Sequence, residues 1–188
     1  MNTDRLYLAL LHFPVLNKRG DIVTTSVTNM DIHDISRAVR TYGIERFYIV
    51  TPILKQHDYV NRIIHHWQEG YGVTYNPSRG EAFQRVTVKC TLEDVVADIE
   101  QGAGRGVQTV ATSAEPRLKT TSFKELKRIM ARGRDAYLLV FGTGWGSATE
   151  VIDGADYLLE PIMGLTDYNH LSVRSAVAIV LDRLLGKR

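Results

Sequence analysis

Short apolar runs alternate with capped helical segments along this chain, and this alternation restricts the fold more than any other feature. Leu6–Leu11 is a continuous apolar run of strand length, and Thr28–Asp31 is a capping box for a helix that ends near Gly43. Strands alternating with helices predict one α/β domain over residues 1–188, with a mostly parallel sheet covered by helices on both faces. Further strands are expected at 47–50, 86–90, 107–112, 136–141 and 157–159, further helices at 54–69, 91–102, 122–132, 148–152 and 171–185, and a loop at 71–81.

Three polar loops follow strands in the second half of the chain. They cover residues 112–117, 142–147 and 160–169. In an open parallel sheet, ligands bind beyond the carboxyl ends of the strands. We therefore expect a ligand site where these three loops meet.

The second of these loops contains three closely spaced glycines, Gly142, Gly144 and Gly146. A Walker phosphate loop and the dinucleotide-binding fingerprint both require other spacings, so the pattern excludes them. Glycine allows a ligand to approach the backbone closely, but a tight strand-to-helix turn would need the same residues. Trp145, between the glycines, would either cover an aromatic ligand or fill the core.

Side chains that could carry out catalysis on their own are sparse. Cys90 is the single cysteine, and it lies in an alternating strand-like segment as a small apolar residue would. His65 and His66 are adjacent, so they point to different sides of a helix and make a poor metal pair, and no metal site is predicted. A Gly-x-Ser-x-Gly nucleophile motif is also absent. This composition indicates chemistry that depends on positioning an already activated donor.

Charge is segregated along the chain, although the net charge is only +2. Seven basic residues between Arg117 and Arg134 stand against Glu125 alone, whereas Glu150–Asp167 holds five acids and no base. Such a basic stretch fits a polyanion, or it is a solvated helix face. The N-terminus does not resemble a signal peptide and no apolar run approaches the ~20 residues of a membrane span, so a cytoplasmic protein is expected.

Two motifs carry a resemblance to a known superfamily. Phe141–Gly146, together with Glu160–Gly164 and Asn169–Ile179, resembles motifs 2 and 3 of the SPOUT methyltransferases, which are knotted RNA methyltransferases that use S-adenosyl-L-methionine (AdoMet). More narrowly, the chain resembles a small bacterial family of SAM-dependent RNA methyltransferases, sometimes joined to a tRNA guanine-N1 methyltransferase. The resemblance implies a C-terminal deep trefoil knot, AdoMet bound within it, and a homodimer that methylates tRNA or rRNA.

The resemblance also implies roles for individual residues. Arg37 matches a family arginine, whereas Asp31 stands where the ribose-methylating branch has asparagine, so the methylated base or ribose atom stays open. From their place in the pocket loop, Asp167 or His170 is the candidate base if the acceptor atom needs deprotonation, and Arg174 would instead orient the acceptor or the AdoMet carboxylate. The expected catalytic residues are Arg37, Asp167 and Arg174. The AdoMet contacts implied are Thr112, Ser113, Phe141, Gly142, Gly144, Trp145, Gly146, Glu160, Pro161, Ile162, Gly164, Tyr168, Asn169, Leu171 and Ser172.

Two other functions remain open from the residues alone. A non-catalytic RNA-binding module on the same fold would bind RNA without affinity for AdoMet. A Rossmann-like enzyme acting on a small molecule would instead bind a nucleotide such as ATP or a nicotinamide cofactor.

Overall fold

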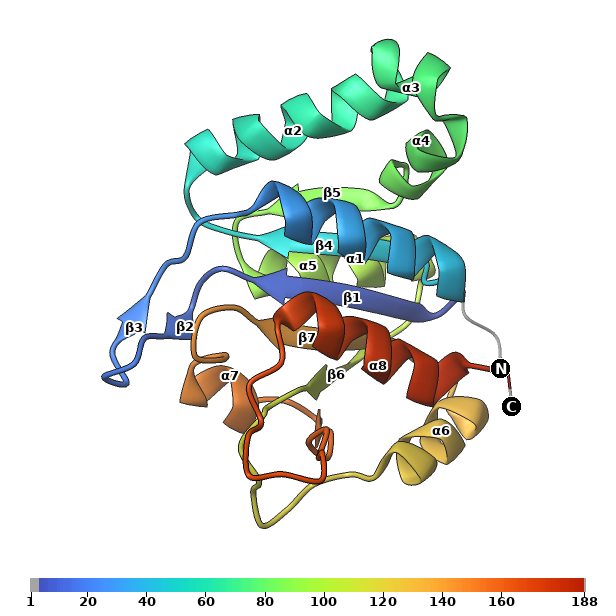
Figure 1. Cartoon of the computed structure of the whole chain (residues 1–188). Helices are drawn as coiled ribbons and strands as arrows, with labels where there is room; N and C mark the ends of the chain where they lie inside the picture. The colour runs from blue at the N-terminus through green and yellow to red at the C-terminus, as the bar shows by residue number, and fades with distance from the viewer. Residues whose placement is uncertain (1–3, 188) are drawn as a thin grey trace.

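A parallel sheet of six strands forms the centre of the structure, a computed structural model that describes residues 4–187 (Figure 1). Its strand-to-strand pairings are all parallel, which confirms the predicted sheet. The strand order is β5 (Val86–Lys89), β4 (Arg46–Val50), β1 (Leu6–Leu11), β7 (Ala136–Gly142), β6 (Val107–Ala111) and β8 (Tyr157–Leu158).

Strand β1 lies in the middle of the sheet and is buried along its whole length. Leu6, Leu8 and Leu10 belong to the core on one face, whereas Tyr7, Ala9 and Leu11 belong to the core on the other. A strand covered on both faces has no polar side to alternate with, so its sequence is a continuous apolar run.

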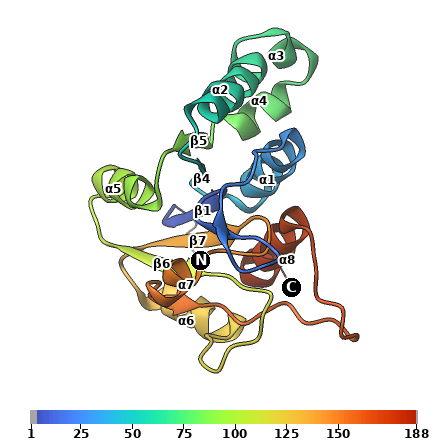
Figure 2. The same cartoon turned by 90° about the vertical axis from the view of Figure 1, so that its left-hand side faces the viewer.

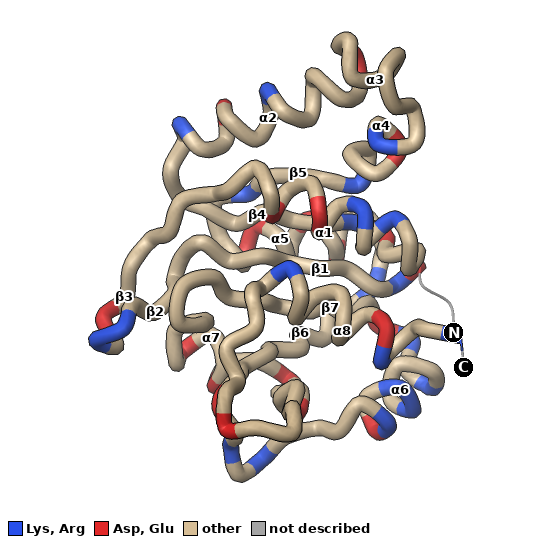
Figure 3. Tube along the Cα trace, in the orientation of Figure 1, with Lys and Arg blue, Asp and Glu red and all other residues tan. Residues whose placement is uncertain are grey.

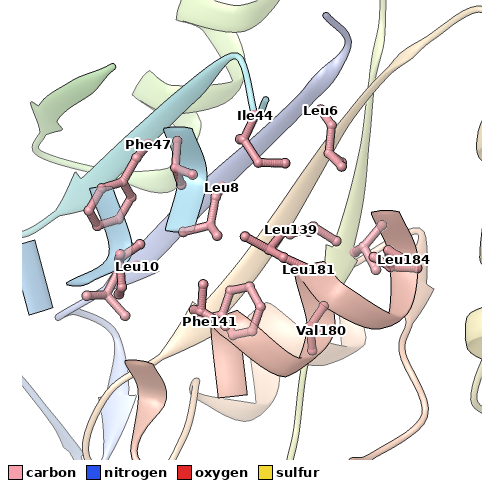
Figure 4. Packing of buried hydrophobic residues seen from close by; sticks show 14 of the residues in the cluster. Leu6, Leu8, Leu10, Ile44, Phe47, Leu139, Phe141, Val180, Leu181 and Leu184 are labelled. Carbon is pink, nitrogen blue, oxygen red and sulfur yellow. The ribbon is translucent and has the colours of Figure 1, made fainter. Parts of the chain in front are cut away.

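Helices cover both faces of the sheet, as Figure 2 shows. On one face lie α1 (Asn29–Tyr42), α8 (Val173–Leu185) and α6 (Phe123–Arg132), whose apolar residues share one core cluster. Figure 4 shows this packing, with Phe141 of β7 close to Val180 of α8. On the opposite face lie α5 (Leu92–Ala103) and α7 (Thr149–Asp153).

The predicted cap at Thr28 is confirmed, and two further helices begin in the same way. Thr28 and Ser122 each accept a hydrogen bond from the backbone amide three residues on, and Thr91 forms a reciprocal capping box with Asp94. Gly43 ends α1 in the left-handed conformation at φ 72°, where a side chain would be strained.

The prediction of a loop over 71–81 is wrong. After α2 (Leu54–Gln68), the chain forms two short helices, α3 (Tyr71–Tyr75) and α4 (Pro77–Phe83). Asn76 caps α4 by accepting a hydrogen bond from the amide of Arg79, and Pro77 occupies the first turn, which suits a residue that has no amide to donate.

Two glycines in this segment serve close packing rather than a loop. A Cβ at Gly72 would lie 2.7 Å from Cε3 of Trp67, and a Cβ at Gly80 would lie 2.7 Å from the carbonyl oxygen of Trp67. Both distances are shorter than real Cβ contacts, so only glycine lets α3 and α4 approach α2 this closely.

A small antiparallel hairpin, β2 (Val15–Leu16) and β3 (Ile22–Val23), was not predicted because two-residue strands have no readable periodicity. Leu16 donates its amide to the carbonyl of Gly146 at 2.9 Å and accepts from the amide of Trp145 at 2.9 Å. The hairpin therefore holds the glycine loop from one side.

The path of the C-terminal segment, residues 159–172, leads from the sheet to α8 (Figure 1). The strand order and the layering match the predicted α/β class, and the trefoil knot itself stays a prediction. Among residues 4–187, no helix combines the length and apolar character needed to cross a bilayer.

Candidate functional site

The three loops predicted to meet are joined at the carboxyl edge of the sheet. The side chain of Asn169, in the third loop, donates from Nδ2 to the carbonyl of Ala114 in the first loop at 2.8 Å. The ring of Trp145, in the second loop, lies edge-on to that of His170, with centroids 6.1 Å apart. The third loop and the residue directly after it therefore contact each of the other two loops through one side chain.

Glycine is required at the three positions of the second loop for different structural reasons. A Cβ at Gly142 would lie 2.2 Å from the amide nitrogen of Ser147, so the turn itself excludes a side chain there. Gly144 has φ +61°, and its Cβ would lie 2.9 Å from the carbonyl oxygen of Leu16. Gly146 has φ +104° with open space where a side chain would stand. The turn explains Gly142 and Gly144. The open space beside Gly146 lets a ligand approach it closely, while its own amide and carbonyl bond to Thr143 and Leu16.

Glu160 has a structural contact that the sequence did not indicate. Its Oε1 accepts a hydrogen bond from the amide of Phe123 at 2.7 Å, and its own amide donates to Thr121 at 3.0 Å. The carboxylate thus lies at the N-terminus of α6, where the helix dipole favours a negative charge. This contact fixes the start of the third loop beside the segment that precedes α6.

Other predicted contact residues also make bonds within the chain. Thr112 donates its hydroxyl to the carbonyl of Val140 at 2.9 Å, and Ser113 accepts from the amide of Glu115 at 3.0 Å. Ser172 caps α8 by accepting from the amide of Ser175. Phe141 is buried in the core, so it supports the loop from beneath.

The remaining predicted contact residues line the third loop at its surface. Tyr168 is 71% exposed, and its ring lies edge-on to His170 with centroids 5.3 Å apart. A Cβ at Gly164 would meet open space. Leu171 is exposed, whereas Pro161 and Ile162 are half-buried.

The three predicted catalytic residues do not lie in one cluster of contacts. Arg174, at the start of α8, pairs through Nε with Asp31 at 3.2 Å and through Nη1 with Asp34 at 3.1 Å, and so joins α8 to α1. Arg37 is exposed one turn further along α1, and Asp167 is exposed in the third loop. Asp31, which is 8% exposed, is held by the hydroxyl of Thr28 at 2.6 Å.

His12, at the end of β1, is a polar site residue that the sequence reasoning missed. Its Nδ1 lies 3.0 Å from the hydroxyl of Thr25, which in turn contacts the hydroxyl of Thr143. Because Thr143 donates its proton to the carbonyl of Leu11 at 2.9 Å, Thr25 must donate to Thr143 and accept from His12. The hydrogen-bond pattern therefore assigns the proton of His12 to Nδ1 and leaves a lone pair on Nε2.

The imidazole of His12 is fully buried. Its Nε2 finds no hydrogen-bond partner among the residues that the structure describes. Burial lowers the pKa of His12 to about 4, although the carboxylate of Asp31 acts in the opposite direction. His12 is therefore neutral at physiological pH. A histidine directly after an apolar strand was the signal in the sequence that could have identified it.

The central part of the basic stretch lies on α6, where Figure 3 shows Lys and Arg positions recurring along the helix. Phe123, Leu126 and Met130 are buried against the sheet, whereas Lys124 and Arg128 are exposed on the outer side. The sequence left two alternatives for this stretch, a phosphate-binding face and a solvated face. Both alternatives agree with the exposure of Lys124 and Arg128.

Two cavities lie near the sheet edge. One, of about 830 Å³, is lined by residues 117–121, 152–153 and 155–158, and the other, of about 450 Å³, lies between α5 and α7. Neither is lined by the glycine loop. The structure groups no three His, Cys, Asp or Glu side chains as metal ligands within residues 4–187.

The family model described as SAM-dependent RNA methyltransferase matches residues 5–186. The chain belongs to this family. A protein of Aquifex aeolicus described as uncharacterized is 44% identical to this methyltransferase over 188 residues, covering all of this chain and 91% of the other. A tRNA (guanine-N(1)-)-methyltransferase of Oleidesulfovibrio alaskensis is 44% identical over 181 residues, which are 96% of this chain but only 42% of that protein.

Solved structures confirm the fold expected from the family. The SpoU methyltransferase AviRb from Streptomyces viridochromogenes, solved in complex with AdoMet, superposes with a TM-score of 0.55 at 15% identity. The match covers 98% of this chain and 58% of the other. The fold is thus that of the SPOUT methyltransferases, as the two sequence motifs indicated.

Proposed function

We propose that this methyltransferase, as one SPOUT-like unit over residues 1–188, binds AdoMet between the loops 112–117, 142–147 and 160–169 and methylates a nucleotide of tRNA. The convergence of these loops at the carboxyl edge carries the proposal. Two contacts support it, from Asn169 to the first loop and from Trp145 to His170. Such a cross-linked set of loops is a preorganised ligand site of the kind found at this edge of parallel sheets.

The residues present fit AdoMet. Gly146 and Gly164 have open space beside their backbones, so a ligand can approach the peptide groups closely. The hydroxyl of Ser147 is buried without a hydrogen-bond partner among the described residues, and a bound ligand would satisfy it. Trp145, 58% exposed, offers an aromatic face for the adenine.

AdoMet, when bound, supplies a methyl group on a positively charged sulfur, so the acceptor needs orientation more than activation. Arg174, fixed by Asp31 and Asp34, lies where α8 follows the third loop and would orient the acceptor nucleotide. Asp167 or His170 would accept the proton of the acceptor atom, and Arg37 would contact an RNA phosphate. The basic face of α6 would hold phosphates further along the RNA.

The name of one relative supports tRNA as the substrate class but not the methylated atom. This chain spans less than half of the tRNA (guanine-N(1)-)-methyltransferase that it matches. The remainder of that protein can carry the activity in its name. We therefore propose tRNA without assigning guanine N1.

A homodimer is part of the proposal. Two large apolar side chains of the third loop are exposed: Leu165 fully and Met163 to 55%. Apolar surface of this kind beside a ligand site is commonly covered by another protein surface. Light scattering of the native protein and of the Leu165→Glu variant would test this, since the substitution should produce monomers.

The main test combines cofactor binding with methyl transfer. Calorimetry should detect binding of AdoMet and of S-adenosylhomocysteine, and the Trp145→Ala variant should bind both more weakly. The control, Ile22→Ala, removes an exposed apolar side chain of the hairpin and should bind normally. With labelled AdoMet as the donor, the protein should transfer labelled methyl groups to tRNA taken from cells that lack the protein. Binding of RNA with no binding of AdoMet would refute the proposal and favour a non-catalytic RNA-binding module.

A further inference from the structure

Helices α2, α3 and α4, residues 54–83, form a helical arm that projects from one edge of the sheet (Figures 1 and 2). The arm connects β4 to β5, two strands that are direct neighbours in the sheet. It lies outside the three cofactor loops, and neither the SPOUT motifs nor the glycine loop explain it.

Helix α2 has two different faces. Val60 is buried, and Ile63, Ile64 and Trp67 pack against the core, which places the inner stripe at a helical spacing of three to four residues. The outer stripe has the same spacing and consists of the exposed residues Lys55, Tyr59, Arg62 and His66. A basic and aromatic stripe thus faces away from the molecule, with Asp58 the one acid in the helix.

Two exposed tyrosines follow in α3, the next helix along the chain. Tyr71 is 73% exposed and Tyr75 is 72% exposed. Their rings are nearly parallel, at 28°, with centroids 6.3 Å apart. Aromatic faces this exposed bury little within the chain, so they contribute little to its stability, whereas they suit stacking against a planar ligand.

The support beneath the tyrosines is tightly packed. Trp67 stacks on Phe83 with centroids 6.1 Å apart, and the guanidinium of Arg79 lies 4.7 Å from the centroid of the Trp67 indole ring. Gly72 and Gly80 leave no room for a Cβ beside Trp67, as described above. The arm therefore presents Tyr71 and Tyr75 from a packed base rather than from a loose loop.

The arm lies on the same face of the sheet as the helices that border the cofactor loops. Helix α4 packs on α1, α1 packs on α8, and α8 packs on α6. The arm flanks β5 at one edge of the sheet, and α6 lies toward the opposite edge (Figure 2). Five strand spacings separate the two edges, about 24 Å. A ligand that contacts both ends of this face must be a macromolecule, not a single nucleotide.

We propose that the outer face of the helical arm is a second RNA-binding surface, on which unpaired bases of the substrate stack against Tyr71 and Tyr75 while Lys55 and Arg62 contact phosphates. The inference rests on the proposed RNA methyltransferase function and adds the surface that holds the RNA away from the methyl-transfer site. Aromatic side chains interspersed with basic ones are the combination that binds single-stranded RNA segments.

The test measures binding of total tRNA from cells that lack the protein, by fluorescence anisotropy. The variant Tyr71→Ala/Tyr75→Ala should bind this tRNA about 5- to 150-fold more weakly for each base that stacks. Tyr71→Phe/Tyr75→Phe keeps the rings and should bind as the native protein does. Leu54→Ala removes an exposed aliphatic side chain from the same arm and should also leave binding unchanged. Because these side chains are exposed, all variants should fold, which circular dichroism would verify.

The basic residues give an independent readout. Lys55→Gln/Arg62→Gln should reduce the slope of log affinity against log salt concentration by about 1.4 to 1.8, the contribution of two phosphate contacts. AdoMet affinity should stay at the native value in every arm variant.

Several outcomes would overturn the proposal. Stacking on these rings would be excluded if the double alanine variant binds tRNA as tightly as the native protein. It would also be excluded if the alanine and phenylalanine variants lose equal amounts of tRNA affinity. A changed oligomeric state with unchanged tRNA affinity would make the arm a protein contact. If AdoMet does not bind but tRNA binding depends on Tyr71 and Tyr75, the proposed function fails while the surface stands.

Discussion

The buried neutral histidine at the end of β1 should make folding stability depend on pH. In the folded chain, burial lowers the pKa of His12 to about 4, against about 6.5 when the chain is unfolded. Between these values the unfolded chain binds a proton that the folded chain does not bind. The free energy of unfolding therefore falls as the pH falls through this window.

The size of the effect follows from the gap between the two pKa values. Each pKa step of 1 corresponds to about 1.4 kcal/mol, so His12 should remove about 3 kcal/mol of stability once the pH is below 4. At pH 4.5 the loss should already be about 2.5 kcal/mol, whereas at pH 7.5 it should be close to zero.

The variant His12→Asn isolates this contribution. The amide group of asparagine can take the place of Nδ1–H and donate to Thr25, but it does not titrate. Urea unfolding of both proteins between pH 7.5 and 4.5 gives the difference in free energy of unfolding, in which the other titrating groups cancel. That difference should move by about 2.5 kcal/mol in favour of the variant as the pH falls.

A second variant separates burial from hydrogen bonding. Thr25→Val removes the hydrogen-bond partner of His12 but keeps the imidazole buried, so its stability should be lower and its pH dependence should resemble that of the native protein. If the difference between native protein and His12→Asn stays constant with pH, the imidazole is not buried and neutral in the folded chain, and the reasoning fails.

Three further predictions concern the site and the RNA surface. Gly146→Ala should reduce the free energy of unfolding by about 1–2 kcal/mol, because φ +104° strains a residue with a Cβ, and should weaken AdoMet binding in calorimetry, whereas Gly164→Ala should leave stability nearly unchanged. Glu160→Ala removes the acceptor at the first amide of α6 and should cost about 1 kcal/mol in urea unfolding, a loss that would be absent if that bond does not form. Lys124→Gln/Arg128→Gln should lower the salt dependence of tRNA binding by about 1.4 to 1.8 in log–log slope, and an unchanged slope would make the outer side of α6 a solvated surface.

Most elements of the fold could be predicted because their signals are local. The uninterrupted apolar run of β1 follows from burial on both faces, and the caps at Thr28, Thr91 and Ser122 follow from hydrogen bonds within one turn. The loop predicted over 71–81 was wrong because the glycines there are required by contacts with a residue of the preceding helix α2 and not by a turn. Gly72 and Gly80 mark contact with Trp67, and no local rule distinguishes that from a turn.

The candidate site was predictable in part for the same reason. Loops at the ends of parallel strands must share an edge, so the meeting of the three loops could be expected from the order of elements alone. The partners of Arg174 could not, because Asp31 and Asp34 lie about 140 positions away along the chain and only the packing of α8 on α1 joins them. The hydrogen bond from Phe123 to Glu160 could not be predicted for the same reason, because the two residues are far apart along the chain.

By itself, the sequence determined the parallel α/β architecture, the family and the loops that border the site, because periodicity, capping and motif spacing are properties of neighbouring residues. Only the tertiary structure decided which glycine has open space beside it, which ring nitrogen of His12 carries the proton and which face of α2 is exposed. Those features depend on atoms brought together from distant parts of the chain, where close contact and exclusion of water set the energy.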